Sequence, residues 1–116
     1  MRLTIVGCAG SFPGPDSPAS CYLVEHDGHR VVLDMGNGSF GGLQRYADIY
    51  DIDAVVLSHL HADHCLDLTS YYVARRYHPD GPRGQVPVLG PRGTGPRMVR
   101  AYDLPPAEAM DGEFDF

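Results

Sequence analysis

Three histidines and one aspartate lie within six consecutive positions near the middle of the chain. They are His59, His61, Asp63 and His64, in the pattern His-x-His-x-Asp-His. Imidazole nitrogens and carboxylate oxygens are common ligands of zinc and other first-row metals. In an extended segment, residues two apart point to the same side, so His59 and His61 can face one ion. If a helix follows, Asp63 and His64 leave in another direction, and the pattern favours two neighbouring ions.

The alternative is a surface loop that happens to be rich in histidine. Half of the six histidines fall within these six positions, and an acid lies among them. The apolar run Ala54-Val55-Val56-Leu57, which reads as a buried strand, directly precedes the motif. A buried strand that delivers such donors favours a metal site over a solvated loop.

The elements that must position this motif follow from apolar periodicity and turn residues. We expect strands at residues 3–8, 21–26, 29–35, 53–57 and 85–89, and the start of another at 113–116. We expect helices at residues 41–51, from 64 or 65 to 77, at 98–102, and a short one beginning at Pro105. Asp27-Gly28 predicts a hairpin turn between the second and third strands.

Four further features carry candidate chemistry. The loop at residues 7–18 is rich in Gly, Pro and Ser. With Gly10 and the Ser11 hydroxyl, it could line a substrate and offer N–H groups to an anion. A plain connecting loop is an equal alternative. His26 and His29 flank the hairpin and are expected to be solvated, His78 is expected to end a helix, and Cys65 is expected to be a small buried residue.

Composition limits the class of protein. The net charge is −6, and all nine basic residues are arginines. This balance does not favour nucleic-acid binding, although a local arginine patch could serve. Three cysteines argue against a disulfide scaffold, and no signal peptide or membrane-length apolar run is evident. These features predict a cytoplasmic protein.

The motif resembles the signature of the metallo-β-lactamase superfamily, and residues 1 to about 68 follow that family's opening order of elements. Within it, Gly7-Cys8-Ala9-Gly10-Ser11 with Pro13 is most similar to the ribonuclease Z and cyclic-nucleotide phosphodiesterase branch. The resemblance implies an α/β (α+β sandwich) fold. Residues 1–116 would form a single partial domain, the N-terminal ββα half of an αββα sandwich. The family's later ligands would lie in the absent C-terminal half.

The same resemblance implies a metal-dependent hydrolase that acts through a metal-bound hydroxide. The cofactors would be two divalent ions, with zinc expected and manganese or iron as alternatives. His59 and His61 would hold the first ion, and Asp63 and His64 the second, with Asp63 also orienting the nucleophile. Asp34 would support the metal loop through hydrogen bonds without ligating, although a plain cap is the alternative.

The expected substrate is a phosphodiester, either a cyclic nucleotide or the 3′ end of an RNA, with RNA less favoured by the charge. A lactone, thioester or β-lactam remains open because the motif selects metals and not substrates. The family often has glycine where this chain has Asp67, which could brace an imidazole or favour a helix start. A non-catalytic half-domain is the alternative function, and a homo-oligomer or association with the missing half is expected.

Overall fold

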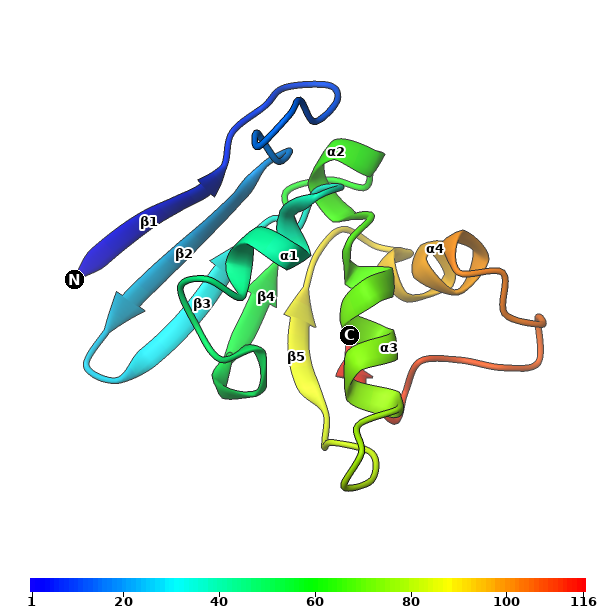
Figure 1. Ribbon diagram of the computed structural model, residues 1–116. Coiled ribbons are helices and arrows are strands. Elements are labelled where there is room, and N and C mark those ends of the chain that lie inside the picture. The colour runs from blue at the N-terminus through cyan, green and yellow to red at the C-terminus, as the bar shows by residue number, and fades with distance from the viewer.

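The computed structural model describes all 116 residues as a six-stranded sheet with helices (Figure 1). The strands lie side by side in chain order, and the first three pair antiparallel whereas the last three pairings are parallel. Their bounds are β1 Arg2–Gly7, β2 Cys21–His26, β3 His29–Leu33, β4 Ala54–Val56, β5 Val86–Leu89 and β6 Phe114–Asp115. The predicted α/β fold class is therefore confirmed.

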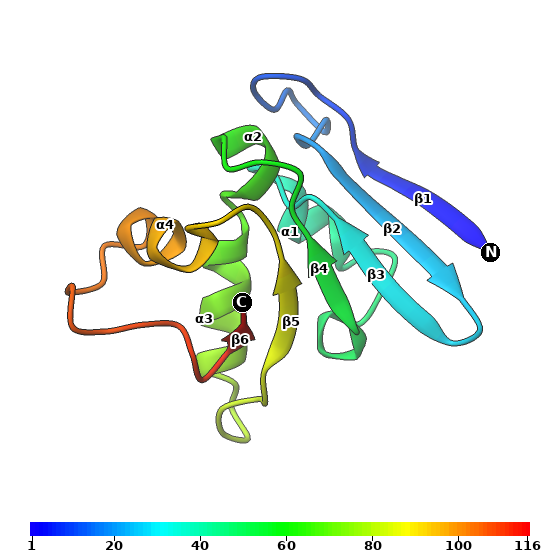
Figure 2. The same cartoon turned by 180° about the vertical axis from the view of Figure 1, so that it is seen from behind.

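The helices are α1 Ser39–Leu43, η1 Ile49–Asp51, α2 Ala62–Cys65, α3 Leu68–Arg76 and α4 Thr94–Ala101. Helices α1 and α3 lie on one face of this sheet, in front of it in Figure 1 and behind it in Figure 2. Helix α2 lies beyond the ends of the strands, and α4 lies to the side, past β5. None of these helices combines the length and the hydrophobicity needed to cross a lipid bilayer.

The core lies between the helices and one face of the sheet. Leu23, Val32, Val55 and Val88 are successive cross-strand partners in β2 to β5, and all are buried. Strand side chains alternate between faces, so this row presents one continuous apolar ridge to the helices. Burying each such side chain contributes about 1.5–3 kcal/mol relative to exposure. The ridge anchors the strands whose ends carry the candidate site.

Three predicted helices differ from the structure. The helix expected at 41–51 ends at Leu43, because Gly41 and Gly42 weaken its continuation, and the chain resumes as the short η1. The helix expected to run to Tyr77 is divided into α2 and α3. No helix forms after Pro105, where the chain makes turns, since the residue before a proline is disfavoured in helical conformation.

One predicted helix is longer than expected. The segment expected to become helical at Met98 is already helical from Thr94, which follows Gly93 in a left-handed conformation with φ 89°. Thr94 donates its hydroxyl to the Pro91 carbonyl at 2.6 Å and closes the turn before the helix. Pro96 is accommodated because proline is tolerated in a first helical turn.

Candidate metal site

The site is built at the carboxyl ends of two neighbouring parallel strands. Asp34 directly follows β3, and Ser58 lies two residues beyond β4. Carboxyl ends of parallel strands meet at one edge of a sheet, where binding sites commonly form. The backbone N–H of Asp34 donates to the Val56 carbonyl at 2.8 Å, so the ladder continues to the residue that carries the carboxylate. Asp34 has φ 58°, a left-handed conformation that is uncommon outside glycine.

The buried Asp34 carboxylate accepts three hydrogen bonds from the motif region. The Ser58 N–H donates to Oδ1 at 2.7 Å and its hydroxyl to Oδ2 at 2.8 Å. His64 Nδ1 lies 2.7 Å from Oδ2. An imidazole that donates from Nδ1 keeps its lone pair on Nε2, which is the arrangement a carboxylate imposes on a metal-ligating histidine. The structure thus brings the Asp34 carboxylate into contact with Ser58 and His64, and its support of a metal ligand stays a prediction.

The backbone of Met35 and Gly36 packs directly on the motif. The Met35 N–H donates to the His64 carbonyl at 2.8 Å, and the Met35 carbonyl accepts from Asp67 N–H at 3.0 Å. A Cβ added to Gly36 would lie 2.0 Å from the Asp63 carbonyl oxygen, so only glycine permits this approach. The segment after β3 therefore acts as a platform for the loop that carries the donors.

The motif side chains form one cluster at this edge. The ring centroids of His59 and His64 lie 4.0 Å apart, and those of His59 and His61 lie 4.9 Å apart. His64 Nε2 is 3.2 Å from Asp63 Oδ2. No three His, Cys, Asp or Glu side chains of the chain form a group arranged to hold a metal ion. In chemistry and proximity the donors fit a divalent metal, but as neighbouring pairs and not as a complete set.

The glycine-rich loop after β1 reaches the same cluster. The backbone N–H of Ser11 donates to Asp63 Oδ2 at 3.1 Å, across 52 positions of sequence. Partial burial opposes ionisation of Asp63, but the Ser11 N–H and the neighbouring His64 and His59 together lower the pKa of its carboxyl. The loop that contains Gly10 and Ser11 therefore contacts the metal loop through a backbone donor, whereas the Ser11 hydroxyl takes no part in this contact.

The Asp67 carboxylate contacts the start of α1 and not the histidine cluster. It immediately precedes α3, as one alternative required, but its carboxylate accepts the Phe40 N–H at 2.8 Å at the start of α1. Burial raises the pKa of Asp67, and the backbone N–H groups of Phe40, Gly38 and Ser39 oppose that rise. The other alternative, in which Asp67 braces an imidazole, receives no support from its hydrogen bonds, because this carboxylate connects α1 to α3.

The remaining histidines do not join the cluster. His26 and His29 lie on the β2–β3 hairpin, where their exposed rings approach Asp27 at 3.4 Å and Asp53 at 3.7 Å. The His78 ring packs edge-on against Tyr50 with a centroid separation of 4.7 Å.

Two further residues lie beside the motif, and the sequence analysis identified only one of them. Cys65 is buried, and burial raises the pKa of its thiol. Ser58, which hydrogen-bonds both Asp34 and His59 Nδ1, was not among the predicted site residues. Its position between the strand and the first motif histidine was the available signal.

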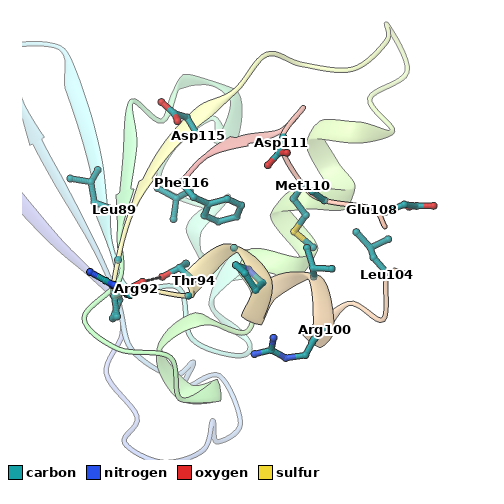
Figure 3. Close-up of a pocket in the computed structure, with 18 of the residues that line it drawn as sticks. Leu89, Arg92, Thr94, Arg100, Leu104, Glu108, Met110, Asp111, Asp115 and Phe116 are labelled. Carbon is teal, nitrogen blue, oxygen red and sulfur yellow. Dashed lines mark hydrogen bonds between the residues drawn. The ribbon is translucent and has the colours of Figure 1, made fainter. Parts of the chain in front are cut away.

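A separate hollow of about 1150 Å³ lies beside β5, α4 and the last residues of the chain (Figure 3). Apolar side chains such as Leu104, Met110 and Phe116 line much of it, together with Arg92 and Arg100. No histidine or cysteine and no residue of the motif contributes to its wall. The hollow is therefore distinct from the candidate metal site.

The chain belongs to the metallo-beta-lactamase superfamily, because residues 14–115 match that family. An uncharacterized protein of Mycobacterium tuberculosis is 50% identical over 103 residues, which cover 87% of this chain and 37% of that protein. A probable metallo-hydrolase of Bacillus subtilis, YhfI, is 34% identical over 76 residues, covering 66% of this chain and 31% of YhfI. A ribonuclease Z of Halorubrum lacusprofundi is 34% identical over 68 residues, covering 59% of this chain and 22% of that ribonuclease.

Solved structures show the same fold. YhfI from Bacillus subtilis superposes with a TM-score of 0.70 at 30% identity, over 76% of this chain and 37% of YhfI. The short form of human tRNase Z gives a TM-score of 0.76 at 22% identity, over 100% of this chain and 44% of the enzyme. This chain thus spans less than half the length of these relatives.

Proposed function

We propose that this chain carries part of the active site of a metal-dependent phosphodiester hydrolase. The observation that carries the proposal is the Asp34 carboxylate, which binds His64 Nδ1 at 2.7 Å and the Ser58 backbone at 2.7 Å. A buried carboxylate that orients an imidazole beside further imidazoles and a second acid suits metal binding better than a solvated loop. Similarity to a probable metallo-hydrolase agrees with this reading.

His59 and His61 would hold one divalent ion, and Asp63 and His64 a second, with zinc the expected metal. When bound, such ions lower the pKa of water and stabilise charge on a phosphoryl group. The residues of the chain would orient these donors. Asp34 holds the His64 ring, Ser58 holds the His59 ring, and Ser11 holds one oxygen of Asp63, which leaves its other oxygen free to orient the nucleophile.

A phosphodiester is the proposed substrate class because ribonuclease Z is among the relatives of this chain. The substrate would be a cyclic nucleotide or an RNA 3′ end, and the net charge of −6 favours the smaller anion. Because each ion receives only two donors here, we propose that further ligands come from outside these 116 residues, by continuation of the domain or by association.

The test is metal binding and turnover with one ligand variant and one matched control. His61→Ala removes a proposed ligand, whereas His29→Ala removes an exposed histidine of the hairpin. We expect zinc affinity, measured by titration calorimetry, to fall about a hundredfold or more for His61→Ala and to stay unchanged for His29→Ala. Hydrolysis of bis(4-nitrophenyl) phosphate should require the metal and be lost with His61→Ala. Equal zinc affinity in both variants would overturn the ligand assignment.

One observation supports an alternative function: no group of three or more metal-binding side chains is complete within this chain. In this alternative the chain is a non-catalytic half-domain that binds metal weakly and packs against a partner. Metal-dependent turnover that is sensitive to His61→Ala would exclude it. Metal binding without turnover, in every assembly that contains this chain, would support it. Turnover of a lactone, thioester or β-lactam in place of the phosphodiester would retain the hydrolase and change the substrate.

A further inference from the structure

Phe12 is an exposed aromatic residue near the candidate metal site, and it has no role in the proposed metal binding. It is 72% exposed, so a ligand at the surface can reach its ring. It directly follows Ser11, whose N–H donates to Asp63 Oδ2 at 3.1 Å. An exposed aromatic residue therefore stands one position from the contact between this loop and the metal loop.

The loop that carries Phe12 is held by its own hydrogen bonds. The Phe12 N–H donates to the Gly10 carbonyl at 2.9 Å and makes a tight turn. Gly14 and Ser17 exchange two backbone hydrogen bonds at 2.8 and 3.1 Å, and Ala9 N–H donates to Pro18 at 3.0 Å. The backbone on both sides of Phe12 is thus ordered, so a ligand that meets the ring would not have to order the loop first.

We propose that Phe12 is a recognition residue that stacks on the nucleobase of a nucleotide held at the metal loop. This inference rests on the proposed phosphodiesterase function and specifies its substrate class. The phenyl ring has no hydrogen-bonding atom, so it can select a planar aromatic group without distinguishing one base from another. Phe12 acts on specificity and not on the reacting phosphate, whose neighbours are the motif side chains.

The test measures base-dependent binding and needs no turnover. The 116-residue chain, with zinc present, is titrated by NMR with adenosine 5′-monophosphate and with ribose 5-phosphate, which carries the same phosphate but no base. We expect the base-containing ligand to bind about tenfold more tightly and to shift the Phe12 ring resonances. Phe12→Ala should bring the two affinities together, Phe12→Leu should recover only part of the difference, and Phe12→Tyr should retain it.

Tyr77→Ala is the matched control, because Tyr77 is 65% exposed and follows the far end of α3 from the metal loop. It should leave the preference for the base unchanged. A preference that survives Phe12→Ala, or equal affinities of the original chain for the two ligands, would overturn the proposal. If the preference depends on Phe12 but no assembly hydrolyses a phosphodiester, then the hydrolase proposal fails and the base-binding role of Phe12 stands.

Discussion

Two parts of the molecule combine histidines with acids, and they differ in what lies behind the side chains. In the metal loop, His64 is 22% exposed and contacts an Asp34 side chain that is 10% exposed. On the hairpin, His29 is 77% exposed and approaches an Asp53 side chain that is 49% exposed. The first pair is a 2.7 Å hydrogen bond, whereas the second lies at 3.7 Å in solvent.

The hairpin satisfies its charges locally. Glu25 accepts from Arg2 at 2.8 Å and from Arg30 at 3.4 Å, and the Arg2 hydrogen bond in particular lowers the pKa of the Glu25 carboxyl. Solvent screens ion pairs of this kind, so they contribute little to stability. The comparison teaches that a histidine and an acid become a candidate site when a buried carboxylate and the backbone hold them, and not merely when they are neighbours in sequence.

The largest expected difference between the two regions lies in their glycines. Gly36→Ala would place a methyl group 2.0 Å from the Asp63 carbonyl oxygen, which cannot move without displacing the metal loop. We expect a loss of about 3 kcal/mol in the free energy of unfolding, measured by urea denaturation. Gly28→Ala on the hairpin meets no atom within 4 Å but keeps φ +78°, so a loss of about 1 kcal/mol is expected. Equal losses would show that the metal loop is not packed on Gly36.

A smaller effect is expected from the supporting carboxylate. Asp34→Ala leaves the Ser58 N–H and His64 Nδ1 without their acceptor, which should cost about 2 kcal/mol of stability in the same denaturation experiment. Zinc affinity should also fall about 10- to 100-fold, because the His64 ring loses its orientation. Asp34→Asn, which keeps one acceptor oxygen, should lose less of both. An unchanged zinc affinity in Asp34→Ala would mean that His64 needs no support to bind metal.

Much of the sheet could be predicted because its strands are defined locally. β2 was predicted to the residue, since the Asp27-Gly28 turn and the apolar residues around it limit where the strand can lie. The motif could be located for the same reason, because its donors are spaced within six positions. These features depend on residues close together in the chain.

The rest of the site depends on long-range contacts that spacing does not encode. The bond from Ser11 to Asp63 spans 52 positions, and Asp67 reaches Phe40 across 27. Either acid could have met an imidazole, and only the packing of α1 beside α3 decides that Asp67 binds the start of α1. The helix expected at 41–51 was predicted with the wrong bounds, because burial of Ser39 and Leu43 lets α1 form across the two glycines between them despite their weak helix propensity.

The smallest expected effect concerns the three cysteines, which carry no function in the proposed mechanism. Burial raises the pKa of Cys21 to about 12, and burial likewise raises that of Cys65, whereas Cys8 is exposed. A raised pKa keeps a thiol protonated until the pH approaches that value, and the thiol, unlike the thiolate, does not react with iodoacetamide. At pH 8 we expect mass spectrometry of the native chain to show one modification, at Cys8.

Cys65 lies in α2, directly after the last motif histidine, so its protection from labelling reports whether the metal loop stays packed. Rapid labelling of Cys65 in the unaltered chain would show that the metal loop opens readily. The contrast between a packed metal loop and a solvated hairpin would then be wrong. Labelling of Cys65 only in Gly36→Ala would instead show that the segment after β3 keeps the donor loop closed.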